Sequence, residues 1–80
     1  MNDEELMARI EARPGVLDGK PVIRGTRLSV EYVVNLLAHG ETPGAIVQEY
    51  EGLTDDDIRA CLLFAKRAME DLSFVPLMAN

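Results

Sequence analysis

The sequence predicts a mainly α-helical fold: a three-helix bundle of the homeodomain-like, helix-turn-helix kind, preceded by one or two short β-strands. Two observations support this prediction. Residues 29–72 hold three segments with helical apolar spacing, each opened by Ser or Thr and separated from the next by glycine. Residues 10–28 hold instead short apolar stretches between turn-forming glycines and prolines. The 80 residues are expected to form a single domain over 1–80, ending in an apolar tail at 73–80.

The first third of the chain is predicted to be extended and rich in turns. Residues 3–9 suit one short helical turn, and residues 10–13 are weakly strand-like. Residues 20–23 are the better strand candidate, because Pro21 cannot donate to a ladder and belongs at an edge or at a strand start. Gly25-Thr26 is expected to end that strand. Further turns are expected at Pro14-Gly15 and Asp18-Gly19.

The first helix of the bundle is predicted to begin after Ser29. A serine at this position can accept a hydrogen bond from a backbone N–H group of the first turn. The apolar residues that follow have the spacing of one buried stripe, and Gly40 suits the left-handed residue that ends a helix. The stripe consists of Val30, Val33, Val34 and Leu37.

The second helix is predicted to be short and the third to be long. Thr42-Pro43 opens the second helix, since threonine is a good cap and the missing N–H of proline costs nothing at the first position. Gly52 is expected to end it. Thr54 and Asp57 have the spacing of a capping box at the start of the third helix, residues 55–72. The inner face of the second helix is expected to be Ile46, Val47 and Tyr50.

The third helix carries more apolar surface than two short helices can cover. One stripe runs through Ile58, Cys61 and Met69, and a second lies beside it at Phe64 and Ala68. Two interpretations remain open. The surplus face is a surface for a homodimer or another partner, or it is covered by the N-terminal strand segment.

Charge is divided unevenly along the chain, whose net charge is −6. Residues 13–27 include four basic residues and one acidic residue, whereas residues 28–58 include seven acidic residues and no Lys or Arg. Each part can attract a partner of the opposite sign. A solvated acidic surface is the simpler interpretation of the second part.

The segment Gly19–Arg27 is the first candidate for a contact site. Its basic side chains and turn-forming glycines predict a surface that touches a partner rather than a part of the core. If DNA is bound, this segment and Arg13 are expected to contact the phosphate backbone. The third helix is less suited to reading DNA, because it begins with three carboxylates, Asp55 to Asp57. The candidate contact residues are Lys20, Arg24, Gly25, Thr26 and Arg27.

The sequence does not predict an enzyme, a metal site or a cofactor site. His39 falls at the end of a helix, where a capping role suffices. Cys61 falls on an apolar stripe, where cysteine usually packs without reacting. These two residues are too few for zinc, which needs about three or four ligands.

The composition predicts a cytoplasmic protein. No apolar run approaches the roughly 20 residues of a membrane span, and no secretory pattern precedes the fold. A single cysteine cannot form an internal disulfide, which fits a reducing compartment.

The tail after the third helix is strongly apolar. Segments that lie in water at the end of a domain rarely have this composition. It is expected to fold back on its own domain or to dock into a partner as an extended segment. The residues concerned are Phe74, Val75, Pro76 and Leu77.

The string Gly-Lys-Pro-Val-Ile-Arg-Gly-Thr-Arg-Leu at residues 19–28, the helix up to Gly40, and the segment from Ile46 to Ile58 closely resemble the bacterial family called domain of unknown function 433. The resemblance covers residues 10–70. It implies a compact three-helix, homeodomain-like fold preceded by short strands. It also implies an antitoxin of a toxin–antitoxin system, paired with a PIN-like nuclease toxin, and it implies no catalytic residues.

Three functions follow from these observations. The leading hypothesis is a non-enzymatic antitoxin, whose tail or whose arginines at 24–27 block the acidic, metal-binding cleft of the nuclease. The second is a dimeric helix-turn-helix regulator that binds DNA, which is compatible with the first because antitoxins often regulate their own genes. The third is a structural homodimer with neither partner.

Overall fold

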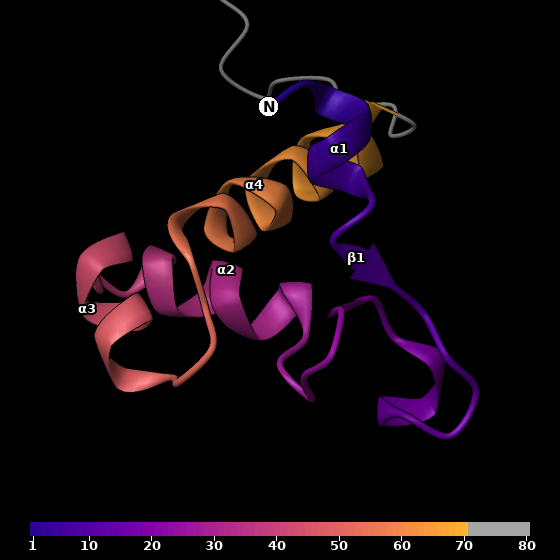
Figure 1. The fold of residues 1–80 in the computed structure, drawn as a ribbon, viewed down its shortest axis with the longest axis horizontal. Helices are drawn as coiled ribbons and strands as arrows, with labels where there is room; N and C mark the ends of the chain where they lie inside the picture. The colour runs from indigo at the N-terminus through magenta and orange to yellow at the C-terminus, as the bar shows by residue number, and fades with distance from the viewer. Residues whose placement is uncertain (71–80) are drawn as a thin grey trace, which may run out of the picture.

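The computed structural model describes residues 1–70, which form a helical domain with a small N-terminal sheet (Figure 1). The predicted class, mainly α with short strands before the bundle, is confirmed. The elements are α1 (Asp3–Met7), β1 (Ile10–Glu11), the 3-10 helix η1 (Leu17–Gly19), β2 (Val22–Ile23), α2 (Val30–Ala38), α3 (Pro43–Glu49) and α4 (Asp55–Glu70).

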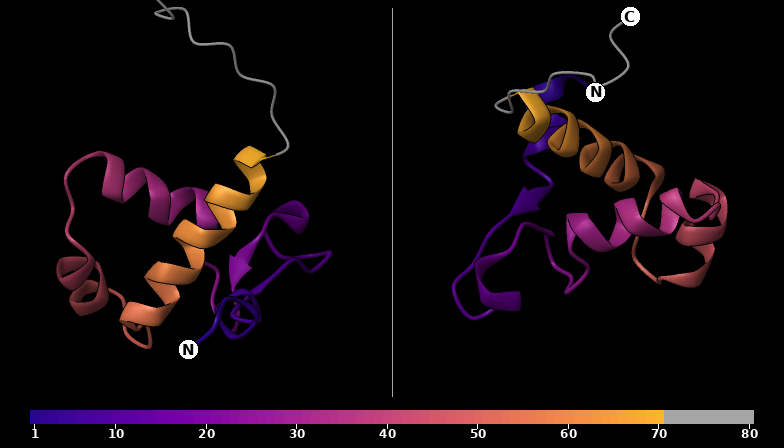
Figure 2. Two further views of the ribbon diagram at one scale, coloured as in Figure 1. Left: turned by 90° about the horizontal axis from the view of Figure 1, so that it is seen from above. Right: turned by 180° about the vertical axis from the view of Figure 1, so that it is seen from behind.

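The long helix α4 is the element on which the others pack. Helices α1 and α2 contact it most extensively, and α3 and β1 contact it as well. Figure 2 shows α2 and α3 on one side of α4 and the N-terminal strand segment on the other. The N-terminal segment therefore covers part of the wide apolar surface of α4. Leu62 and Met69 nevertheless remain 48% and 61% exposed.

The strand β2 is enclosed on both of its edges. It pairs with β1 in antiparallel register, with Ile10 opposite Ile23, and Val22 forms a further bridge to Ser29. Val22 is 0% exposed and Ile23 is 2% exposed. The expectation that the basic segment makes contacts rather than filling the core is therefore wrong for these two residues, because β1 and the start of α2 bury them.

The helix ends follow the predicted local chemistry. The Ser29 hydroxyl accepts a hydrogen bond from the Tyr32 N–H at 2.9 Å, and the Thr42 hydroxyl accepts one from the Ala45 N–H at 3.1 Å. At the end of α2, Gly40 has a φ of +96°, which L-residues with a Cβ rarely adopt. This conformation lets the two amides after His39 reach back to carbonyls of the last turn. Side-chain caps therefore start α2 and α3, and a glycine stops α2.

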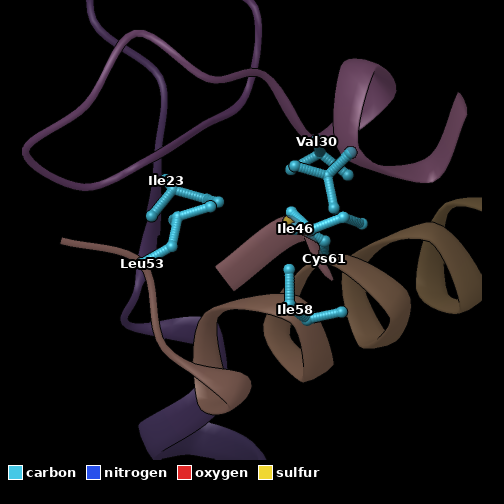
Figure 3. Packing of buried hydrophobic residues seen from close by; sticks show 7 residues of the cluster. Ile23, Val30, Ile46, Leu53, Ile58 and Cys61 are labelled. Carbon is cyan, nitrogen blue, oxygen red and sulfur yellow. The ribbon is translucent and has the colours of Figure 1, made fainter. Parts of the chain in front are cut away.

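The core lies where β2, α2, α3 and α4 meet. Figure 3 shows side chains from these elements and from the turn before α4 converging on one another. Around them pack half-buried side chains that include Leu37, Val47 and Phe64. The buried cluster consists of Ile23, Val30, Val33, Ile46, Leu53, Ile58 and Cys61.

Some predicted features fall beyond the part of the chain that is described. The third helix was expected to reach residue 72, and the described helix reaches Glu70. The tail residues Phe74, Val75, Pro76 and Leu77 also lie outside the described residues. Within residues 1–70, no helix combines the length and the apolar character that crossing a membrane requires.

Candidate functional site

A tight turn between β2 and α2, which we call the basic turn, presents Arg24 and Arg27 of the segment Gly19–Arg27. The Thr26 hydroxyl donates to the Ile23 carbonyl at 2.8 Å and accepts a hydrogen bond from the Leu28 N–H at 3.0 Å. The backbone closes the same loop, since the N–H groups of Ile23 and Thr26 bond to the Leu28 and Ile23 carbonyls, each at 3.0 Å. Gly25, at the tip, has a φ of +80°. The buried strand and these four hydrogen bonds hold the turn in one conformation.

Arg24 connects this turn to the N-terminal helix. Its backbone N–H donates to the Arg9 carbonyl at 2.8 Å, and its guanidinium donates to the Ala8 carbonyl just after α1. A cation beside the last carbonyls of a helix is favourable. Arg24, predicted as a contact residue, therefore already has a partner within the domain, and it positions the turn against α1.

The other predicted basic residues differ in how far they are already engaged. Lys20 donates to Glu31 at 3.1 Å, and Arg13 pairs with Glu11 at 3.1 Å. Arg27 is exposed and forms no ion pair with any of residues 1–70. Of the predicted cations, Arg27 is therefore the one whose side chain has neither an ion pair nor a hydrogen bond to residues 1–70, so its guanidinium is available to a partner.

A partly buried ion pair lies next to the turn, and no pattern in the sequence predicts it. Arg9 donates to Asp57 Oδ1 at 3.0 Å, while Asp57 Oδ2 accepts from the N–H of Thr54 at 3.0 Å and from its hydroxyl at 3.2 Å. The Asp57 side chain is 8% exposed and that of Arg9 is 31% exposed. The spacing of Thr54 and Asp57 predicted the helix cap correctly. Nothing local in the sequence pointed to Arg9.

A polar hollow of about 430 Å³ surrounds this ion pair. Its lining includes Glu5 and Ala8 of the N-terminal segment, both arginines, and Asp57. Each arginine has a hydrogen-bond acceptor within the domain, and the Asp57 carboxylate accepts three hydrogen bonds. The three segments that line the hollow are therefore held together by arginine and carboxylate groups that already have hydrogen-bond partners within the domain.

A second hollow, which we call the α2–α4 groove, is apolar. It has a volume of about 330 Å³, and the Lys20–Glu31 ion pair borders it. One wall comes from α2 and from the residues just before β2, and the other comes from α4, whose contribution includes two alanines. The apolar lining consists of Pro21, Val30, Val34, Phe64, Ala65 and Ala68.

Two tyrosines join α2 to the end of α3 at the surface. The hydroxyl groups of Tyr32 and Tyr50 are 2.6 Å apart, and the rings meet edge to face with centroids 6.1 Å apart. The hydrogen bond to Tyr32 and partial burial raise the pKa of Tyr50 to about 12. The Tyr50 phenol is therefore neutral at physiological pH, and the tyrosine pair links the two helices.

His39 and Cys61, the two side chains with potential catalytic chemistry, both have structural roles. Nδ1 of His39 lies 2.8 Å from the Asn35 carbonyl at the end of α2, as expected for a capping residue. Cys61 is fully buried, and burial raises the pKa of its thiol to about 12. Across residues 1–70, no three His, Cys, Asp or Glu side chains come close enough to hold a metal ion.

The family model described as protein of unknown function (DUF433) matches residues 10–65, which is most of the chain and includes the whole basic turn. The chain belongs to the DUF433 family. Arg9, α1 and the end of α4 from Lys66 onwards lie outside the matched segment of this DUF433 protein.

A solved structure shows the same family and a similar fold. It is the crystal structure, at 2.00 Å resolution, of a DUF433 member protein from Anabaena variabilis ATCC 29413. The two proteins share 30% sequence identity and superpose with a TM-score of 0.75, over 84% of this chain. This DUF433 chain spans 66% of the length of that protein. None of the curated proteins matches it.

Proposed function

We propose that this DUF433 protein is a non-enzymatic, antitoxin-like binding module that inhibits a PIN-like nuclease. The observation that supports the proposal is that the basic turn is rigid and carries an arginine without an ion pair. Arg27 projects from a loop held by four hydrogen bonds, and its guanidinium forms no ion pair with residues 1–70. A rigid loop loses little conformational entropy when it binds, so its charge can contribute more fully to affinity.

The chemistry of Arg27 suits an acidic, metal-binding cleft. A guanidinium donates two parallel hydrogen bonds to one carboxylate, and it remains charged at every physiological pH. Placed among metal-ligating carboxylates, it would occupy the position of the metal ion and that of the substrate phosphate. Arg24 would act indirectly, because its hydrogen bonds to the Ala8 and Arg9 carbonyls orient the turn that carries Arg27.

Inhibition of a PIN-like nuclease encoded beside this gene tests the proposal. We expect Arg27→Glu to weaken inhibition by about 30-fold or more, the size of a lost charge-pair contact at an interface. Arg59→Glu is the matched control, since Arg59 is an exposed arginine on α4 without an ion pair to residues 1–70. Full nuclease activity in the presence of excess wild-type protein would contradict the antitoxin role.

A second function, DNA binding by a dimer, is favoured by the order of elements from α3 to α4. A short helix, a turn containing Gly52 and a longer helix follow one another, as in a helix-turn-helix. The carboxylates at the start of α4 oppose base reading, so Arg27 and Arg13 would contact phosphates instead. Binding that weakens steeply with salt, with a slope reduced by Arg27→Ala, would support this function. A weak and salt-independent signal would exclude it.

We further propose a cytoplasmic location. Cys61 is a reduced thiol enclosed by the core, and the described chain has no second cysteine with which to form a disulfide. This usage is typical of a reducing compartment. Fractionation of expressing cells provides the test, and recovery in a secreted fraction would contradict it.

A further inference from the structure

We propose that the α2–α4 groove is the docking site for the chain's own segment 73–78, which folds back onto α4 in the same molecule. This inference goes beyond the proposed function and does not depend on it. It rests on the composition of the groove, on the position of α4 and on the sequence that follows α4.

The groove has the shape and chemistry of a site for apolar side chains. Its walls are carbon-rich, and the two alanines of α4, Ala65 and Ala68, leave room that larger residues at these positions would fill. Leaving such a surface in water is unfavourable by about 25 cal/mol for each Å² of apolar area. An apolar occupant that reaches the groove therefore gains free energy.

The segment that follows α4 has the matching composition. Residues 73–78 read Ser-Phe-Val-Pro-Leu-Met and carry no charged side chain. Pro76 disfavours the helical conformation at Val75, which favours an extended path from that residue onwards. An extended segment can dock by placing its alternate side chains in the pockets of its binding site.

The distances allow the segment to reach the groove of its own molecule. The groove-lining residues Phe64, Ala65 and Ala68 belong to the last described turns of α4, and Glu70 is its last described residue. From Phe64 to Glu70 the helix rises about 9 Å. In the proposed docked form residues 71–74 are extended and span up to about 13 Å, so Phe74 can return to the level of Phe64. Because so short a linker gives a local concentration in the millimolar range, the segment of the same molecule outcompetes that of a second copy.

Proteolysis of the full-length chain tests the inference. Chymotrypsin cleaves after Phe74, Leu77 and Met78, and a docked segment is cut only while it is detached. Ala68→Glu places a carboxylate in the groove at an exposed helical position, and Ala38→Glu is the matched control near the end of α2. We expect Ala68→Glu to accelerate cleavage of the tail about tenfold, as for a segment docked about nine-tenths of the time. Ala38→Glu should change the rate by less than about twofold.

Each outcome of the proteolysis experiment either supports or overturns docking of the segment within one molecule. Faster cleavage in Ala68→Glu alone, at a rate independent of protein concentration and with a monomeric mass, supports docking within one molecule. Equal cleavage rates in the wild type and both variants, with unchanged circular dichroism, overturn it. Protection that grows with protein concentration would assign the groove to a second copy and also overturn it. No nuclease takes part in this experiment, so its failure would be distinct from failure of the proposed function.

Discussion

Arg9 and Asp57 stand 48 positions apart in the sequence, yet the Arg9 guanidinium donates to Asp57 Oδ1 at 3.0 Å. The same carboxylate caps α4 through Thr54, so one side chain both starts the long helix and ties it to the segment after α1. The Arg24 guanidinium donates to the carbonyl of Ala8, the residue before Arg9. The basic turn, the N-terminal segment and the start of α4 are thus connected through neighbouring residues.

Loss of the Arg9 side chain should destabilise the domain. Arg9→Met leaves the Asp57 carboxylate buried without its cation, and we expect the free energy of unfolding to fall by about 2 kcal/mol. This loss is smaller than the loss expected when a wholly buried ion pair is broken, because Arg9 is partly exposed to solvent. Denaturant unfolding measures it, with Arg59→Met as the control. A double-mutant cycle with Asp57→Asn should give a coupling energy of at least about 0.5 kcal/mol. A coupling energy near zero would show that the contact is unimportant.

The Thr26 hydroxyl should be needed for the rigidity of the basic turn. Thr26→Val keeps the shape of the side chain but removes two hydrogen bonds, and we expect it to lower the free energy of unfolding by about 1–2 kcal/mol. Thr26→Ser retains the hydroxyl and should restore most of the loss. Equal stability of the valine and serine variants would mean that the backbone alone holds the turn.

Replacing Leu17 by glycine should stabilise the protein. Leu17 has a φ of +49° and is 39% exposed, so its side chain is held in the left-handed region while burying only part of its surface. The left-handed region costs an L-residue about 1–2 kcal/mol. Because glycine also makes the unfolded chain more flexible, we expect a net gain of about 0.5–1 kcal/mol in Leu17→Gly. Thermal unfolding measures the gain, and a fall in the midpoint would show that packing of Leu17 outweighs the strain.

Stability should fall in alkaline solution, and Cys61 should contribute to the fall. Burial raises the pKa of its thiol from 9.0 to about 12, so the folded state favours the neutral thiol. The stability that this raised pKa contributes is fully present below pH 9, where the thiol is neutral in the folded and unfolded states. It is lost progressively as the pH rises towards 12. The raised pKa of Tyr50 acts in the same direction above pH 10.

Denaturant midpoints at roughly pH 8 and pH 11 test this prediction. Cys61→Ala should be less stable than the wild type at the lower pH because it leaves a small cavity in the core. It should lose less stability than the wild type on going to the higher pH. An identical loss in both proteins would show that Cys61 does not contribute.

Local chemistry explains which parts of the fold were predictable. The hydroxyls of Ser29, Thr42 and Thr54 bond to amides three residues further along, and Gly40 ends its helix through neighbouring carbonyls. Each such interaction lies within one turn of chain, so residue type and spacing suffice to find it. The apolar stripe of α2 was equally readable, because helical periodicity places Val30 and Val33 on one face.

The candidate site was predicted less completely. The basic segment was found from its composition, but its division into a buried pair, Val22 and Ile23, a positioning residue, Arg24, and an available cation, Arg27, was not. Burial depends on which elements enclose a strand, and β2 is enclosed by partners on both edges. Charge availability depends on neighbours that are distant in the sequence.

The sequence by itself determined where α2, α3 and α4 begin, where α2 ends, and the family, because these depend on contacts within a few residues or on a contiguous motif. Only the tertiary structure decided that Arg9 neutralises Asp57, that the N-terminal segment covers part of α4, and that a groove remains beside Ala65 and Ala68. Those features arise from pairing between segments that are far apart along the chain. Their geometry is set by how the elements pack, and no local pattern of residues encodes it.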